Sequence, residues 1–341
     1  MTTEGILTPG FNLTLRPMRY PQFYQAYLQA LKNTWSVDEI SYTTDVADIR
    51  DKLSTSEKHV VSRLIAFFAT GDSVVGNNLV LNLYKHLNSP EVRMYYSRQI
   101  FEEALHVQAY LTLLDNYLPD EMDRFKAFDA INNIPSIKRK ADFCFKWMND
   151  VVSMDECDTD LKKQKFLLNL VTFAAAVEGL FFMAAFAYVY FLRSRGLLHG
   201  LASTTNWIFR DETMHMNVAM EIIDTIRRQY PTLWTGELEK QIIEMLTDAI
   251  DCEMQFADDV LELGIAGLSK ADMSEFLKFC ADQRLARLGI NFRFNGKNNF
   301  AFMDLQNYSE HTNFFERTVS SYQIGTVQAK EENVNLDNMD F

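Results

Sequence analysis

The sequence predicts an all-α protein, a helical bundle built around a four-helix core. Gly and Pro are sparse, at 13 and 7 of 341 residues, which suits long helices joined by few loops. No segment shows the apolar–polar alternation of a half-buried strand. The motif Glu-x-x-His occurs twice, beginning at Glu103 and at Glu212, and residues three apart share one face of a helix.

The expected helices can be placed in order along the chain. Ser54 and Glu57 form a capping-box pattern at the start of one long helix. Ser89 followed by Pro90 gives an N-cap and a first-turn proline for the next helix. Residues 196–200 are expected to form a loop. Helices are expected at about 21–33, 54–87, 90–117, 136–149, 166–192, 202–228, 237–263 and 269–289.

Residues 166–192 are long and apolar enough to be mistaken for a membrane span, and Glu178 is their only charged residue. An acid at the centre of a span is costly in lipid. Basic residues flank both ends, so the segment lacks the charge bias that orients a span. We therefore expect a bundle helix that is buried on all sides, and no membrane association.

Composition narrows the classes of partner and compartment. The formal net charge of −13 argues against nucleic acid as a partner. The N-terminus has neither a basic nor an apolar region of the kind that a secretory signal needs. A reducing, cytoplasmic location is expected because the four cysteines are scattered and form no paired pattern: Cys144, Cys157, Cys252 and Cys280.

Two parts of the chain are expected from the pattern of residues. Residues 1–324 read as a single helical domain, since no linker interrupts them. Residues 325–341 are polar and acidic and end in Asn-Met-Asp-Phe, a composition that is typical of a flexible tail.

Each Glu-x-x-His motif is preceded by a helix with a lone acid in an apolar stretch. Asp72 precedes the first motif and Glu178 precedes the second. Four converging carboxylates need protons or cations, and two divalent metals would neutralise them. Hard oxygens with a few imidazoles suit Fe or Mn better than Zn. The sequence therefore predicts a carboxylate-bridged dimetal site with six ligands: Asp72, Glu103, His106, Glu178, Glu212 and His215.

Three residues near the motifs can each be interpreted in two ways. Asp211 could accept a hydrogen bond from the free N–H of a ligating histidine, or it could be a solvated charge. Glu102 poses the same choice, and we read it as a surface acid. Tyr110 lies four residues after His106 on the ligand face, so it is either a phenol oxidised by the metals or an ordinary core tyrosine.

The surroundings of these residues resemble the radical-generating small (beta) subunit of class I ribonucleotide reductase, a ferritin-like fold, over nearly the whole chain. The resemblance rests on four stretches: Gly71-Asp-Ser-Val-Val-Gly-Asn-Asn78, Arg98-Gln-Ile-Phe-Glu-Glu-Ala-Leu-His106, Val177-Glu-Gly-Leu-Phe-Phe182 and Arg210-Asp-Glu-Thr-Met-His215. It implies the same six metal ligands and makes Tyr110 the radical tyrosine. It also implies an apolar pocket around that tyrosine, formed by Phe182, Phe186 and Ile208.

The resemblance further implies a path for the radical. Trp35 would connect through Asp211 and His106 to the metals, and Tyr322 would pass the radical to the large (alpha) subunit. Glu316 matches a tail acid that is important for this transfer. The last residues, about 333–341, would dock on the large subunit, where ribonucleotides are reduced to deoxyribonucleotides. A homodimer is implied as well.

Several alternatives stay open at this point. Some relatives carry Phe where this chain has Tyr110 and store the oxidising equivalent on a Mn/Fe pair. The two ions could be Fe/Fe, Mn/Mn or Mn/Fe, and a flavoprotein activase could supply a reduced oxygen species in place of O2. A ligand-binding dimetal oxidase on the same scaffold is the second hypothesis, and it would need a substrate cavity and no docking tail. A ferritin-like storage bundle is the third.

Overall fold

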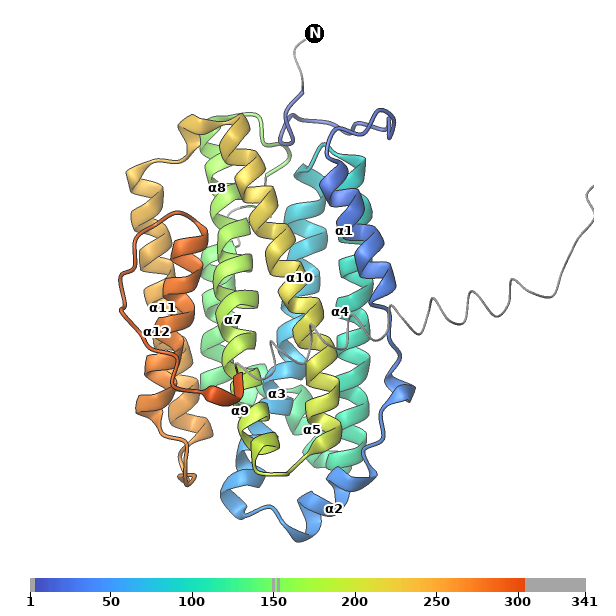
Figure 1. Ribbon diagram of the computed structural model, residues 1–341, viewed down its shortest axis with the longest axis vertical. Helices are drawn as coiled ribbons and strands as arrows, with labels where there is room; N and C mark the ends of the chain where they lie inside the picture. The colour runs from blue at the N-terminus through green and yellow to red at the C-terminus, as the bar shows by residue number, and fades with distance from the viewer. Residues whose placement is uncertain (1–3, 149–150, 152–153, 304–341) are drawn as a thin grey trace, which may run out of the picture. The chain divides into compact units, whose positions relative to one another are not determined.

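The computed structural model is a bundle of long helices, shown in Figure 1. It describes residues 4–148, 151 and 154–303. Within these ranges the described side chains do not include those of Ala69, Asp72, Ser73, Val74 and Phe128. Met1–Phe300 form one compact unit and Ala301–Phe341 form a second, of which the structure describes a helical turn at 301–303. The predicted tail at 325–341 lies outside the described residues.

Helices make up nearly all of the regular structure. No strand forms in the described ranges, and a single isolated bridge joins Ile265 and Leu268. In chain order the helices are α1 (Pro21–Lys32), η1 (Val37–Glu39), α2 (Thr43–Asp51), α3 (Thr55–Asn78), η2 (Leu79–Leu83), η3 (Tyr84–His86), α4 (Pro90–Tyr117), α5 (Glu121–Phe128), α6 (Ala130–Asn133), α7 (Pro135–Met148), α8 (Asp160–Val171), η5 (Thr172–Phe182), α9 (Met183–Ser194), α10 (His199–Gln229), η6 (Pro231–Leu233), α11 (Gly236–Val260) and α12 (Lys270–Arg287).

The four-helix core consists of α3, α4, η5 and α10. Helix α3 packs along α4, α4 contacts α10, and α10 packs along η5. The rings of Phe67 on α3 and Phe182 on η5 lie 5.7 Å apart, which closes the ring of four helices. Helix α1 covers the outer side of α4, whereas α11 and α12 lie on the opposite side of the bundle, against η5. The predicted all-α bundle is confirmed.

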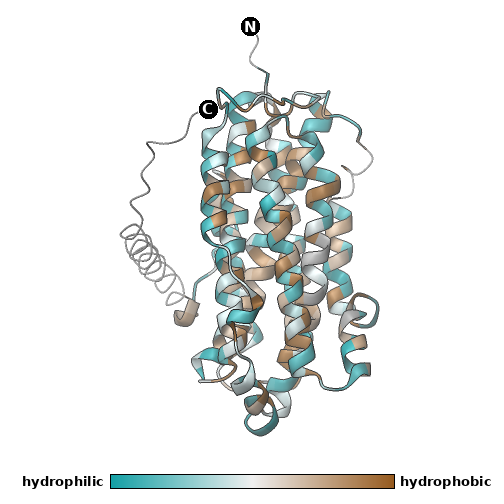
Figure 2. Cartoon of the chain, turned by 90° about the vertical axis from the view of Figure 1, so that its right-hand side faces the viewer, coloured by the Kyte–Doolittle hydropathy of each residue, from teal (hydrophilic) through white to brown (hydrophobic). Residues whose placement is uncertain are grey.

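Local caps explain where the long helices begin. The Ser54 side chain accepts from the backbone N–H of Glu57 and the Glu57 carboxylate accepts from that of Ser54, so the predicted capping box is present. Ser89 caps α4 in the same way, by accepting from the N–H of Val92. Such caps satisfy backbone donors that the first turn leaves without partners. In Figure 2 polar and apolar residues alternate along the outer helices, as expected for amphipathic elements.

Helix α10 begins earlier than predicted, inside the expected loop at 196–200. The Asp45 carboxylate, on α2, accepts the backbone N–H groups of Gly200 and Leu201 at 2.9 and 2.7 Å. Leu198 turns the chain with φ of 52°. The cap therefore comes from another helix, a tertiary interaction that local sequence does not reveal. The short helices α2, α5 and α6 were not predicted either.

The apolar segment is a core helix, as predicted. Helices α8, η5 and α9 run continuously over Asp160–Ser194, the one described helix that is long and apolar enough to cross a membrane. Its most apolar stretch is completely buried inside the bundle. The middle part, η5, has π-helical hydrogen bonding, which often marks a functional site. All of its residues are buried, including Glu178.

Candidate metal centre

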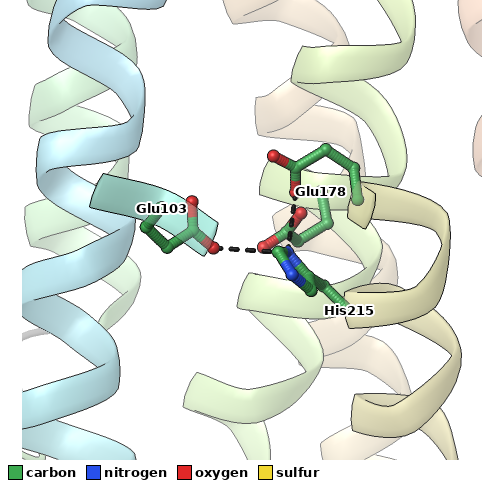
Figure 3. Close-up of side chains that lie close together, drawn as sticks. Glu103, Glu178 and His215 are labelled. Carbon is green, nitrogen blue, oxygen red and sulfur yellow. Dashed lines mark hydrogen bonds and ion pairs between the residues drawn. The ribbon is translucent and has the colours of Figure 1, made fainter. Parts of the chain in front are cut away.

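Carboxylates and imidazoles from three helices of the core converge on one buried point. Helix α4 supplies Glu103, η5 supplies Glu178, and α10 supplies Glu212 and His215. One ligand atom of each of these residues lies within 4.8 Å of the others. Figure 3 shows Glu103, Glu178 and His215 pointing toward one another from different helices. The arrangement can hold a metal ion.

Both imidazoles turn Nδ1 toward the glutamates of the two motifs. His106 Nδ1 lies 3.1 Å from Glu212 Oε1 and 3.7 Å from Glu103 Oε2. His215 Nδ1 lies 3.3 Å from Glu103 Oε1 and 3.2 Å from Glu212 Oε2. The two motifs therefore share one site. Asp72 belongs to α3, but its side chain lies outside the described part of the structure.

The electrostatics of the cluster show a shortage of positive charge. Burial, reinforced by the nearby carboxylates of Glu212 and Glu103, raises the pKa of Glu178 well above its usual value. Among the described residues, neither oxygen of Glu178 has a hydrogen-bond partner. Burial alone would also raise the pKa of Glu212, but Glu178, His106 and His215 hold it well below its usual value. A cation at the cluster would oppose the rise in the pKa of Glu178.

His215 carries part of the compensating charge. Burial alone would lower the pKa of His215, but the carboxylates of Glu102, Glu103 and Glu212 raise it well above its usual value. Metal binding requires neutral imidazoles and ionised carboxylates, so these protons would leave when metal binds. The donor set of carboxylate oxygens and imidazole nitrogens fits Fe or Mn.

Behind His106 lies a chain of hydrogen bonds that ends on an indole. His106 Nε2 is 3.4 Å from Asp211 Oδ2, and the Trp35 Nε1–H donates to the same oxygen at 2.7 Å. The Arg210 guanidinium donates to Asp211 Oδ1 at 3.0 Å. Burial alone would raise the pKa of Asp211, but His106, Arg210 and Trp35 hold it below its usual value. Asp211 is 2 % exposed, which excludes a solvated charge.

Behind His215 lies a second acid, Glu102, and the sequence reading of this residue was wrong. Glu102 is not a surface acid: it is 2 % exposed, and its Oε2 lies 2.9 Å from His215 Nε2. Its other oxygen accepts from Arg98 Nε at 3.0 Å. Asp211 and Glu102 each directly precede a motif glutamate, and this shared position could have indicated a shared role.

Tyr110 lies in an aromatic pocket of the core. It is 2 % exposed and its ring stacks on Phe68, with centroids 5.0 Å apart and an interplanar angle of 6°. The ring centroid of Phe186 lies 5.9 Å from that of Phe68, and the ring centroid of Phe182 lies 6.1 Å from that of Phe186. Ile208 is also buried. Phe68, the ring in direct contact, was not singled out from the sequence.

Some predicted site residues are beyond the described structure. Tyr322, Glu316 and the docking segment at 333–341 all lie outside the described residues.

Known proteins resemble this chain over most of its length. The family model for the ribonucleotide reductase small chain matches residues 12–299. The ribonucleoside-diphosphate reductase small subunit of Dictyostelium discoideum is 34% identical over 325 residues, covering 95% of this chain and 90% of that protein. The beta subunit of Chlamydia pneumoniae is 32% identical, covering 91% and 89% of the two chains.

Solved structures share the fold. The ribonucleotide reductase R2 subunit from Clostridium botulinum superposes with a TM-score of 0.80 at 22% identity, covering 90% of this chain and 94% of that one. The Rnr4 homodimer of Saccharomyces cerevisiae gives a TM-score of 0.74 at 26% identity, covering 93% and 92%. These relatives do not favour the ligand-binding oxidase. The chain belongs to the ribonucleotide reductase small-chain family, and it is a ribonucleoside-diphosphate reductase small subunit with a ferritin-like helical fold and a buried carboxylate site.

Proposed function

We propose that this chain holds two transition-metal ions and generates the oxidant with which a large subunit begins the reduction of ribonucleotides. The observation that carries the proposal is the buried convergence of Glu103, Glu178, Glu212 and His215. His106 faces the same carboxylates, and Asp72 precedes them on the adjacent helix. A bound metal pair, whether Fe/Fe, Mn/Mn or Mn/Fe, would react with oxygen. It would thereby supply an oxidant strong enough to remove an electron from a phenol.

The protein part of the reaction concerns protons, water and the storage of one oxidising equivalent. A cation at the cluster would oppose the burial and the neighbouring carboxylates that raise the pKa of Glu178, and so would favour its ionised form. Tyr110 would hold the oxidising equivalent as a neutral radical, once the metal-derived oxidant had taken its electron and the reduced oxygen species had taken its phenolic proton. The rings of Phe68 and Phe186 exclude water and so protect this radical from reduction. The alternative store is the metal pair itself.

The hydrogen-bonded series from His106 through Asp211 to Trp35 is the proposed route out of the site. Its bonds link the buried cluster to an indole that can be oxidised. We propose that Tyr322 and Glu316 continue the route, and that residues 333–341 dock on the large subunit. A homodimer in the cytoplasm is the proposed working form. Whether a flavoprotein activase assists it depends on the oxidant.

Electron paramagnetic resonance tests the radical site directly. The full chain is loaded with Fe(II), Mn(II) or both, exposed to O2, and examined together with Tyr110→Phe. We expect a tyrosyl signal in the wild type and none in Tyr110→Phe. A persistent metal signal that Tyr110→Phe leaves unchanged would move the oxidising equivalent to the metals.

Tyr96→Phe is the matched control. Tyr96 is on the same helix and fully buried, and its hydroxyl has no hydrogen-bond partner among the described residues, so removing it should cost little. This variant should keep the tyrosyl signal. If both variants lose the signal, the loss comes from a general disturbance of the site. It would then be no evidence that Tyr110 holds the radical.

A further inference from the structure

Arg284 lies on α12, outside the four-helix core, and contacts the helix that carries Glu178. Its Nε–H donates to the backbone carbonyl of Gly179 at 3.2 Å, and Gly179 directly follows Glu178 in η5. Among the residues that the structure describes, no carboxylate pairs with Arg284, and its one hydrogen bond is the bond to Gly179. The side chain of Arg284 therefore links an outer helix to the middle of the buried apolar segment.

The contact leaves no room for a side chain at position 179. A Cβ added to Gly179 would lie 3.0 Å from both Cδ and Nε of Arg284. It would also lie 2.7 Å from the carbonyl oxygen of Ala174, five residues earlier, which is the spacing of π-helical hydrogen bonds. Glycine thus lets two groups approach the same backbone position, the arginine of α12 and the preceding turn of η5 itself.

The Gly179 carbonyl is also not bonded as it would be in an α-helix. There it would accept from the backbone N–H four residues later, that of Met183. In this protein the N–H of Met183 donates to Leu180 instead. Arg284 therefore donates to a carbonyl whose α-helical donor is directed elsewhere.

Helix η5 needs such support because its geometry is uncommon. π-Helical bonding is mostly confined to single turns, whereas η5 extends over Thr172–Phe182. Relaxation to α-helical bonding would close each hydrogen bond one residue earlier, and this change would turn the residues beyond it by about 100° around the helix axis. The direction of Glu178 toward Glu103 and Glu212 thus depends on what keeps η5 in its wide form.

We propose that Arg284 is a positioning residue of the metal centre, which holds η5 in its π-helical form so that Glu178 faces the other ligands. The inference rests on the proposed function, since it concerns a ligand of the proposed metal pair. Arg284 acts through the backbone of Gly179, the residue next to that ligand.

Glutamine and methionine at position 284 separate the hydrogen bond from the packing. Arg284→Gln places an amide nitrogen where the arginine has Nε, so it keeps a donor for the Gly179 carbonyl. Arg284→Met has a similar length but places a methyl group there. Arg287→Met is the matched control on the same helix, because Arg287 is exposed and pairs with Asp224 of α10 at 2.7 Å.

Hydrogen exchange of the metal-free full chain, measured by mass spectrometry, follows the helix directly. Amides of residues 172–182 should exchange roughly tenfold faster in Arg284→Met than in the wild type, and at the wild-type rate in Arg284→Gln and Arg287→Met. Amides of α10 should keep their protection in every variant. Unchanged exchange of η5 in Arg284→Met would overturn the proposal. Equal acceleration in η5 and α10 would overturn it too, because Arg284 would then only stabilise the fold.

Titration with Mn(II), with the free ion measured by electron paramagnetic resonance, follows the ligand. We expect Arg284→Met to weaken Mn(II) binding roughly tenfold, the lower end of the range for residues that orient a metal ligand. Arg284→Gln should bind Mn(II) like the wild type. Wild-type affinity in Arg284→Met, or an equal loss in Arg284→Gln, would overturn the proposal.

Failure of this inference and failure of the proposed function give different results. The inference fails when the variants do not differ as expected, although the wild type binds metal. The proposed function fails in the wild type itself, when deoxyribonucleotide formation with the large subunit is absent. If turnover is absent while Arg284→Met loosens η5 and weakens Mn(II) binding and Arg284→Gln does neither, the positioning role stands and the reductase role falls.

Discussion

The two Glu-x-x-His motifs build two arms that are alike near the metal cluster and differ further out. In the Trp35 arm, His106 faces Asp211, which pairs with Arg210. In the Arg98 arm, defined by His215, Glu102 and Arg98, the histidine faces a glutamate that pairs with an arginine. In both arms the acid comes from the helix of the other motif, so α4 and α10 support each other's histidine.

The difference lies in what each acid contacts next. Asp211 accepts a third hydrogen bond, from the Trp35 indole. Glu102 accepts from Arg98 and faces His215, and no indole donates to it within the described residues. Both acids can orient an imidazole, but the Trp35 arm alone extends to a side chain that can be oxidised. The two acids therefore divide in function: Glu102 supports a histidine, whereas Asp211 supports a histidine and also links the cluster to Trp35.

The largest expected effect is that of Trp35→Phe. This variant removes the indole donor from Asp211, so the Trp35 arm ends at a carboxylate. We expect deoxyribonucleotide formation with the large subunit to be lost, while metal content and the radical signal stay near the wild-type level. Turnover assays and electron paramagnetic resonance on the same samples measure the two quantities.

Trp207→Phe is the control for that change. The Trp207 ring lies 5.1 Å from Trp35, but the Trp35 Nε1–H is the donor to Asp211, so this variant leaves the arm intact. It should retain most of the turnover. If Trp35→Phe and Trp207→Phe lose turnover equally, the loss comes from disturbed packing of the two rings. The hydrogen bond from Trp35 to Asp211 would then not be needed for turnover.

Asp211→Asn should have the next largest effect, because this residue serves both purposes. The amide keeps the size but loses the charge that pairs with Arg210 and orients His106. We expect metal affinity to fall roughly 10- to 100-fold, together with a loss of turnover that excess metal does not restore. Recovery of turnover at saturating metal would mean that Asp211 only supports the ligand.

Glu102→Gln should separate the arms. This acid supports His215 but is not on the route to Trp35. We expect the same order of loss in metal affinity, roughly 10- to 100-fold, but normal turnover once metal is saturating. Metal titration followed by turnover assays at saturation measures both. A turnover defect that persists at saturation would make the arms equivalent and refute the division proposed above.

The arms also show how far sequence alone could predict this site. The motif spacing and the apolar surroundings of Glu178 were enough to predict the fold. They also predicted that Glu178 converges with the glutamates and histidines of the two motifs. Glu102 was missed because a residue next to Glu103 points about 100° away around the helix, toward a face that the sequence leaves undefined. In the folded protein α10 packs against α4, and Glu102 faces His215 of α10. The early start of α10 was missed for the same reason, since its cap, Asp45, lies on another helix.

The smallest expected effect is on stability, and it differs between the two arginines because they are buried to different extents. The side chain of Arg98 is 8% exposed and that of Arg210 is 21% exposed. Removing one member of a buried pair leaves the other charge without compensation, whereas a more exposed pair is screened by water. Arg98→Met should therefore lower the free energy of unfolding of the metal-free protein by about 2 kcal/mol, and Arg210→Met by about 1 kcal/mol or less.

Chemical denaturation of both variants, with and without metal, measures this difference. Metal binding should narrow it, because the cations then compensate the carboxylate cluster to which Glu102 is linked through His215. If Arg210→Met proves the more destabilising variant, then contacts beyond the ion pair decide the result. Arg210 also donates to the backbone carbonyl of Asn33, two residues before Trp35, at 2.6 Å. The arginine of the Trp35 arm would then hold the indole's own segment in place, and the two arms would differ in their structural support as well as in their endpoint.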